Sequence, residues 1–137
     1  MPLSKTVAQL VAQAETEIET LSAAEALAQC EAGTAHIVDI RDVRELWVDG
    51  KVKGALHAPR GMLEFWVDPE SPYHRTVFAS GKKFILYCAK SWRSALETKT
   101  LQDMGFGPVA HIGGGYEAYT NAGLPTEVVE PKLPKNK

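Results

Sequence analysis

The sequence predicts a single α/β domain built on a central, mainly parallel five-stranded sheet with helices on both faces. Short β-prone apolar runs alternate along the chain with segments of helical periodicity, and this alternation is typical of a parallel sheet. The length of 137 residues and the hydrophobic content of 45% suit one domain with a sizeable core. One apolar run stops at Cys88, shortly before a helical pattern, so the sequence places a reactive thiol at the end of a strand.

An amphipathic helix is expected before this sheet. Apolar residues recur there at helical spacing: Val7, Leu10, Val11, Ala14 and Ile18. They predict a helix over about Ser4 to Glu15. We assign residues 1–16 to an N-terminal extension that packs against the surface of the core or against another subunit. Residues 17–128 form the main domain, and the Pro- and Lys-rich segment 129–137 is expected to be a mobile tail.

The main domain is predicted to begin with a short strand over residues 17–21 and a capped helix. Ser22 is a favourable N-cap with Glu25 as its capping-box partner, and Gly33 stops this helix after about Ala32. The next expected elements are a buried strand over 36–40, a helical turn over 42–47, a short strand over 55–58 and a short helix over 62–67.

The second half of the domain contains the strand that leads to Cys88. This strand is predicted over residues 83–87, and a helix over 94–104 follows it. A last strand over 109–112 and a last helix over 116–121 complete the fold. Because parallel sheets bind ligands at the carboxyl ends of their strands, Cys88 lies at the expected ligand-binding edge.

A short polar loop joins the strand of residues 83–87 to its helix, and Cys88 begins this loop. Backbone N–H groups converge at a helix N-terminus and favour negative charge there. The thiol is therefore expected to ionise more readily than a free cysteine and to act as a nucleophile. Arg93 closes the loop and Lys90 adds a second cation. The alternative, a buried inert cysteine, is disfavoured because Cys88 follows the strand and has polar neighbours on its C-terminal side.

Four segments, in this order along the chain, resemble the motifs of rhodanese-like sulfurtransferases. They are the Asp-x-Arg of residues 39–41 with Glu45 behind it, the stretch 50–59 that looks like the family's GHIPGAxNIP segment, the Cys-x4-Arg loop from Cys88 to Arg93, and the Gly-Gly-aromatic turn within 111–119. The resemblance covers about residues 21–127. The family commonly has glycine at the position of Ser91, so the serine would be strained if that position requires a positive φ.

The resemblance implies a sulfurtransferase in which the Cys88 thiolate takes a sulfane sulfur from an anionic, thiosulfate-like donor. A persulfide forms, and a thiol or cyanide acceptor then removes the sulfur. The expected site consists of Cys88 as the nucleophile, Ala89, Lys90, Ser91, Trp92, Arg93 and Ser94 around the substrate, and Asp39, Arg41, Glu45, Gly113 and Gly114 as supporting residues. The two loop cations favour a dianion such as thiosulfate over mercaptopyruvate.

Several of these residues have structural interpretations beside the functional ones. Arg93 can tie the loop to Asp39 or Glu45 while it meets the donor, because a guanidinium offers five donors. Arg41 can pair with Glu45 at the favourable i, i+4 spacing, although the resemblance places it at the border of the site. The glycines 113–115 are a poor phosphate loop because no Lys-Ser/Thr follows them. They are better explained by close backbone approach beside the Cys88 loop.

The aromatic residues and the second cysteine are given structural roles. At least two of Phe65, Trp66 and Tyr73 are expected in the core, the alternative being that one or two cap the pocket. Trp92 either shapes the pocket wall or anchors the loop. Cys30 lies in a predicted helix and is treated as structural.

Composition excludes several function classes. The net charge of −2 with no basic stripe argues against nucleic-acid binding, and no apolar stretch reaches membrane-spanning length. Two cysteines without a disulfide framework and no signal segment favour a cytoplasmic location. The four histidines lack metal-ligand spacing, so we expect neither a metal nor a cofactor. The expected partners are a small anionic sulfur donor and a thiol acceptor, either a small molecule or a protein.

Two other function classes remain open. Cysteine phosphatases and arsenate reductases also use Cys-to-Arg loops, and some share this fold. Related phosphatases carry five residues between Cys and Arg, whereas this chain has four, and the loop offers no general acid. A non-catalytic persulfide carrier or binding module is the third class, but inactive versions of the fold typically lose the cysteine that this chain keeps.

Overall fold

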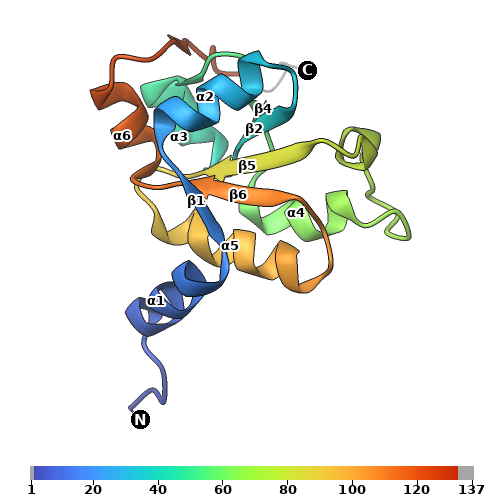
Figure 1. Ribbon diagram of the computed structural model, residues 1–137. Coiled ribbons are helices and arrows are strands. Elements are labelled where there is room, and N and C mark those ends of the chain that lie inside the picture. Colours follow the sequence, from blue (N-terminus) through green and yellow to red (C-terminus); the bar gives the residue numbers. More distant parts are fainter. Residues whose placement is uncertain (1, 133–137) are drawn as a thin grey trace, which may run out of the picture.

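The computed structural model of the protein describes residues 2–132, and a five-stranded sheet lies at its centre (Figure 1). The strands are β1 (Glu19–Leu21), β2 (Ala35–Asp39), β4 (Leu56–His57), β5 (Lys83–Tyr87) and β6 (Val109–Ile112). Their order across the sheet is β1-β6-β5-β2-β4, and every neighbouring pair is parallel. The predicted fold class is therefore confirmed.

Helices cover both faces of the sheet, as predicted (Figure 1). They are α1 (Val7–Glu17), α2 (Ala23–Glu31), α3 (Val43–Asp49), α4 (Arg60–Val67), α5 (Trp92–Asp103) and α6 (Gly115–Asn121), with a 3-10 turn, η1, at Thr76–Ala79. In Figure 1, α2, α3 and α6 lie on one side of the strands, and α4 and α5 lie on the other.

The two faces bury separate apolar cores, and strand β5 contributes alternately to both. Its Ile85 and Tyr87 belong to the core beneath α2 and α6, whereas Phe84 and Leu86 belong to the core beneath α4 and α5. This is the two-residue alternation of side chains along a strand. Cys88, directly after β5, joins the α4 and α5 side. Strand geometry thus places the sulfur on the side where α5 begins.

Capping sets several helix boundaries. The predicted capping box of Ser22 and Glu25 is present at α2. Helix α1 begins after Thr6, later than predicted, because Thr6 forms its own capping box with Gln9. Helix α5 begins at Trp92 instead of residue 94, so the last two residues of the Cys-x4-Arg loop already belong to the helix. The free amides of the first turn of α5 therefore lie within the loop itself.

The N-terminal helix packs against the core, the first of its two predicted placements. Val11 and Ala14 of α1 are buried against Ala95 of α5. The Gln102 side chain of α5 also donates a 2.7 Å hydrogen bond to the carbonyl oxygen of Glu17. Helix α1 therefore packs on α5, the helix that begins in the Cys88 loop, from the side opposite the sheet.

A small second sheet was missed by the sequence analysis. Strand β3 (Lys51–Val52) pairs antiparallel with β7 (Thr126–Glu127), and Lys51 Nζ lies 3.2 Å from a Glu127 carboxylate oxygen. Gly50 has φ +76°, and a Cβ there would lie 2.6 Å from the Glu127 carbonyl oxygen. Two-residue strands leave no alternation to detect. Residues 129–132 of the predicted tail form no regular element, and 133–137 lie outside the described residues.

Glu97 of α5 is a buried carboxyl group with incomplete hydrogen bonding. It is 1% exposed, its Oε2 has no hydrogen-bond partner among the described residues, and its Oε1 lies 3.6 Å from Arg60 Nε. Burial, followed by the neighbouring Glu64, raises the pKa of Glu97 from 4.5 to about 9. The folded protein therefore keeps a proton that the unfolded chain releases at neutral pH.

This proton makes the free energy of unfolding depend on pH. A raised pKa stabilises the fold fully below the unfolded pKa, and this contribution is lost as the pH rises toward the folded pKa. We expect the contribution of Glu97 to fall by up to ~1.4 kcal/mol per pH unit between about pH 5 and pH 8. Urea unfolding of Glu97→Gln, which mimics the protonated acid, should show a stability gain over the parent that grows with pH. The exposed Glu117→Gln is the control, and a gain that stays constant with pH would contradict the prediction.

Candidate active site

Cys88 lies at the carboxyl end of β5, in the middle of the sheet edge where parallel strands bind ligands. Its side chain is 1% exposed. The backbone N–H of Ser94, in the first turn of α5, points to Cys88 Sγ at 3.4 Å, and Ser94 Oγ lies 3.6 Å from the same sulfur. Negative charge on the sulfur is favoured here because the helix N-terminus presents donors and the positive end of its dipole.

The loop from Cys88 to Arg93 surrounds a hollow of about 340 Å³, and all six loop residues line it. Ser91 has φ −164°, which is not positive, so the strain that a positive φ would impose on a serine is absent here. Its Oγ accepts a 3.3 Å hydrogen bond from the Gly114 N–H. Within the described part of the chain, the backbone N–H groups of Ala89, Lys90 and Ser91 have no acceptor, so a bound anion can use them.

The glycine-rich turn after β6 holds the opposite side of the loop. The N–H groups of Tyr116 and Glu117 donate to the carbonyl oxygens of Cys88 at 2.8 Å and Ala89 at 3.0 Å. In a trans peptide the C=O and the following N–H point in opposite directions. With these carbonyl groups directed at α6, the next amide N–H groups of the loop point away from α6.

Gly115 comes closest to the loop backbone; the expectation of close backbone approach covered residues 113–115, whereas only Gly113 and Gly114 were expected as supporting residues. A Cβ at Gly115 would lie 2.5 Å from the carbonyl oxygens of both Cys88 and Lys90, so a side chain there would push the loop away. Gly114 binds Ser91, and Gly113 packs beside Thr20. Three consecutive glycines look alike in a sequence, and only the start of α6 shows that Gly115 approaches the loop backbone while Gly114 bonds to the Ser91 side chain.

Arg93 is held by Glu45 in a two-bond ion pair. Its Nη1 and Nη2 donate to the two carboxylate oxygens at 2.7 and 3.0 Å, and this bonding lowers the pKa of Glu45. Of the two carboxylates considered for Arg93, the structure selects Glu45. The i, i+4 pair of Arg41 with Glu45, considered as the structural alternative, does not form, because Arg41 is bonded to Asp39. The pair uses two of the five guanidinium donors, and Arg93 is 39% exposed. The remaining donors are available to an anion in the hollow.

Lys90 and Trp92 form the outer part of the loop. Lys90 is 81% exposed, and its Nζ lies 4.0 Å from a carboxylate oxygen of Glu117. Both loop cations therefore have an acidic neighbour, which reduces the net positive charge at the hollow. Trp92 is 52% exposed and lines the hollow, so it forms part of the wall and does not anchor the loop in the core.

Asp39 and Arg41 form a buried ion pair beneath the site. Both are at most 1% exposed, and Arg41 Nη2 lies 2.8 Å from Asp39 Oδ2 and 2.7 Å from the Gly50 carbonyl oxygen. Tyr87 donates a 2.5 Å hydrogen bond to Asp39, and the Arg41 guanidinium lies 4.4 Å from the Tyr116 ring centre. This cluster joins β2 and β5 to α6, the helix that holds the loop carbonyls.

The expectation that two of the three aromatic residues lie in the core is wrong. Phe65 and Tyr73 are 50% and 59% exposed and pack edge-to-face against each other, and only Trp66 packs on the core. The eight-residue helix α4 turns Leu63 and Val67 inward instead. None of the three aromatics lines the hollow beside Cys88. Cys30 packs on the other core and, like Cys88, is a free thiol.

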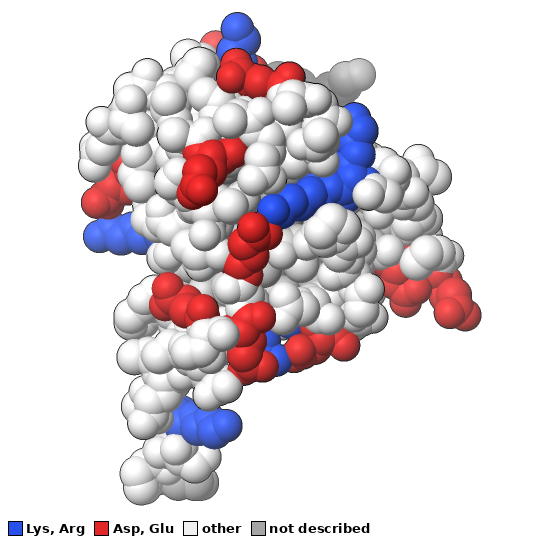
Figure 2. Space-filling model, viewed as in Figure 1, with Lys and Arg blue, Asp and Glu red and all other residues white. Residues whose placement is uncertain are grey.

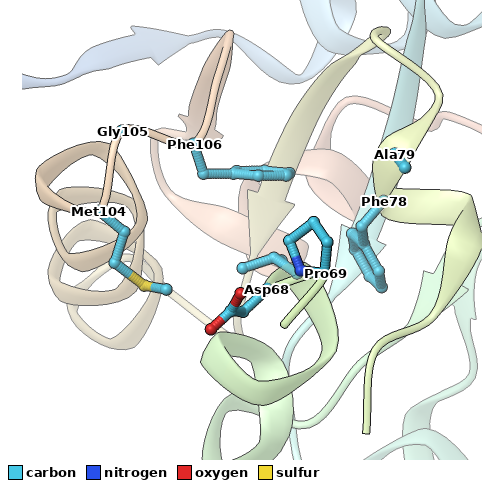
Figure 3. A pocket seen from close by; sticks show the side chains of 8 residues that line it. Asp68, Pro69, Phe78, Ala79, Met104, Gly105 and Phe106 are labelled. Carbon is cyan, nitrogen blue, oxygen red and sulfur yellow. The ribbon is translucent and has the colours of Figure 1, made fainter. Parts of the chain in front are cut away.

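A second, apolar hollow of about 470 Å³ lies at the other end of the sheet (Figure 3). Its lining includes Phe78, Met104 and Phe106, together with Asp68 and Pro69 after α4. Phe78 precedes β5, Phe106 precedes β6, and Asp68 follows α4. The hollow therefore lies at the amino ends of the strands, away from Cys88. Apart from Asp68, the side chains that line this hollow are uncharged.

Charge is mixed over the surface seen in Figure 2, where acidic and basic side chains alternate without a large patch of one sign. Among residues 2–132, no helix combines the length and the apolar character needed to cross a membrane. The same residues include no cluster of three or more His, Cys, Asp or Glu side chains arranged to hold a metal ion.

The fold and the site define an α/β domain whose cysteine begins a six-residue loop at the N-terminus of a helix. The model of the rhodanese-like domain family matches residues 22–122, and the chain belongs to this family. No protein with curated annotation matches the sequence.

Three solved structures illustrate the relationship. A Rhodopseudomonas palustris protein of unknown function, described as a possible tyrosine phosphatase, is 48% identical over 93% of this chain and 98% of its own, with a TM-score of 0.88. A Wolinella succinogenes polysulfide-sulfur transferase homodimer is 29% identical over 87% of this chain and 85% of its own, with a TM-score of 0.66. A Pseudomonas aeruginosa thiosulfate sulfurtransferase is 26% identical over 89% of this chain but only 22% of its own, with a TM-score of 0.69.

Proposed function

We propose that the protein is a sulfurtransferase that carries sulfur as a persulfide on Cys88. The observation that supports this proposal most directly is that the Cys88 thiol lies at the N-terminus of α5, inside a loop that Arg93 closes. The thiolate attacks the outer sulfur of a thiosulfate-like donor and forms a new S–S bond. The S–S bond of the donor breaks, and its electron pair leaves with sulfite. An acceptor thiolate or cyanide then attacks the persulfide sulfur and regenerates the Cys88 thiolate.

The surroundings of the sulfur support this chemistry. The Ser94 N–H stabilises negative charge on Cys88, and the free loop amides and Arg93 suit an anionic donor or the leaving sulfite. Two of the relatives above bear names of sulfur-transferring enzymes, which agrees with this assignment. The proposed partners are therefore a small anionic donor and a thiol acceptor. A reduced, cytoplasmic compartment suits two free thiols.

A tyrosine phosphatase is the second candidate because the Rhodopseudomonas palustris relative bears that description. Phosphate ester cleavage needs an acid that protonates the leaving oxygen. The residues lining the hollow at Cys88 include no carboxyl or imidazole group. Glu45 and Glu117 pair with the loop cations Arg93 and Lys90, but neither lines the hollow. The pKa of Glu45 is also lowered by Arg93, so this carboxyl group is ionised and unsuited to donate a proton. Sulfur transfer requires no such acid, and the geometry favours it.

Intact-protein mass spectrometry tests the proposal. The reduced protein, incubated with thiosulfate, should gain one sulfur atom, ~32 Da, and should lose it again on addition of cyanide, as a covalent sulfur intermediate requires. Cys30→Ser is the matched control and should gain the same mass, because Cys30 is a half-buried residue of α2 that packs on the other core, away from the loop. If thiosulfate, mercaptopyruvate and glutathione persulfide give no gain while p-nitrophenyl phosphate is hydrolysed, the phosphatase assignment replaces this one.

A further inference from the structure

Cys88 contacts a chain of polar side chains that the sulfur-transfer scheme does not use. Ser94 Oγ lies 3.6 Å from the sulfur, His111 Nδ1 lies 2.9 Å from Ser94 Oγ, and His111 Nε2 lies 3.1 Å from Thr20 Oγ1. Ser94 and His111 are fully buried, whereas Thr20 is exposed on the edge strand β1. The chain therefore runs from the nucleophile through β6 to solvent.

The His111 imidazole is neutral within this series of hydrogen-bonded side chains. Burial alone lowers its pKa to about 4, and no carboxylate is among the causes of the shift. A neutral imidazole has one N–H and one acceptor nitrogen. Whichever nitrogen holds the proton, Thr20 completes the hydrogen bonding at Nε2, and Nδ1 faces only Ser94.

The side chains of Ser94, His111 and Thr20 can be hydrogen-bonded in two directions, one when Cys88 is a thiolate and one when it is a thiol. With a thiolate, Thr20 donates to Nε2, the Nδ1–H donates to Ser94 Oγ, and the Ser94 hydroxyl donates to the sulfur. With a thiol, all three bonds reverse, and the Nε2–H donates to Thr20. Ser94 has a competing acceptor, the Ser91 carbonyl oxygen at 3.1 Å. An Nδ1–H directed at Ser94 leaves the hydroxyl proton free to point toward the sulfur.

We propose that His111 is a positioning residue for Cys88, acting through Ser94 to direct a hydroxyl donor at the thiolate. The proposal rests on the role of Cys88 as nucleophile in the proposed function. The first step requires a thiolate, and the second releases one, so a donor that favours the thiolate assists both. The Arg93 guanidinium interacts electrostatically with Cys88, and it lies in the loop, outside the hydrogen-bonded series of Ser94, His111 and Thr20. The effect of His111 is therefore separable from that of the cation.

Two substitutions of similar polarity distinguish the two ring nitrogens. Asn can place an amide N–H where His111 has Nδ1 and so still donate to Ser94. Gln reaches toward Thr20, where Nε2 lies, and withdraws the donor from Ser94. Each variant is made in the Cys30→Ser background, so that Cys88 is the thiol measured. The readout is the pH profile of the alkylation rate with iodoacetamide, which requires no sulfur donor. Sulfur transfer at pH 7 is measured beside it.

The midpoint of the alkylation profile is expected to rise by about one pH unit in His111→Gln, so that the rate at pH 6 falls about tenfold. His111→Asn should remain within a few tenths of a unit of the parent. His36→Gln is the matched control, because His36 stacks on Phe84 in β5 and has no contact with the chain, and it should leave the profile unchanged. In a Ser94→Ala background the difference between Asn and Gln should disappear.

Three results would overturn the proposal: equal midpoints in the parent, Asn and Gln variants, equal shifts in both variants, or a difference that persists without the Ser94 hydroxyl. The alkylation profile is independent of the sulfur donor. If the expected shift appears while thiosulfate, mercaptopyruvate and glutathione persulfide all produce no mass gain, the proposed function fails and the positioning role stands. If the mass gain appears without the shift, the positioning role alone fails.

Discussion

Replacing Cys88 by serine is expected to reduce sulfur transfer at least about a thousandfold, to the level of the assay blank. A hydroxyl group is almost fully protonated near neutral pH, and its oxygen cannot form the persulfide that the two-step reaction requires. The fold should be unaffected, because serine is nearly isosteric with cysteine and can keep the contacts with the backbone and hydroxyl of Ser94. Thiocyanate formation from thiosulfate and cyanide measures the activity, and thermal unfolding checks the fold.

Cys30→Ser is the matched comparison for this variant. Its thiol packs on the core beneath α2 and lies outside the loop hollow, so activity should stay within about twofold of the parent. If turnover survived in Cys88→Ser but was lost in Cys30→Ser, Cys30 and not Cys88 would be the sulfur carrier. Loss in both variants would indicate a reaction that passes through both thiols.

The central fold was predictable because each strand of the main sheet is either an apolar run or lies between two helical patterns. The strand of residues 83–87 has almost no polar residue, as expected of a strand buried on both faces. The β3 and β7 pair was not predictable, because two residues carry no period. The outward orientation of Phe65 was also hidden, since an eight-residue helix with several large apolar residues does not show which of them faces the core.

The candidate site was predictable in its order along the chain but not in its pairings. The loop from Cys88 to Arg93 is visible as a strand, a polar turn and a helix. The choice of Glu45 as the partner of Arg93 depends on how α3 and α5 approach each other, which no local pattern specifies. His111 offered a signal that was not followed, namely a polar residue within the otherwise apolar strand of residues 109–112. A polar side chain inside a buried strand needs a hydrogen-bonding partner, and for His111 that partner is Ser94.

Removing one member of the buried pair of Asp39 and Arg41 is expected to have the largest effect on stability. Arg41→Met leaves the Asp39 carboxylate buried, with Tyr87 and a backbone amide as its remaining donors. We expect a loss of about 3–5 kcal/mol in the free energy of unfolding, because an uncompensated buried charge retains its desolvation cost. Urea unfolding measures the loss. The double variant Asp39→Asn/Arg41→Met should lose less than the sum of the single variants, since the residues share one interaction.

The chain contains a matched control for this prediction in Asp42 and Arg44. These residues have the same i, i+2 spacing and a 2.9 Å contact, but their side chains are 50% and 78% exposed. Arg44→Met should change the free energy of unfolding by less than about 1 kcal/mol, because water screens an exposed pair and solvates a charge that loses its partner. Equal losses in the two Arg→Met variants would mean that burial does not determine the contribution of the Asp39 pair. The Asp39 pair would then no longer explain how α6, and with it the carbonyl side of the Cys88 loop, is held on the sheet.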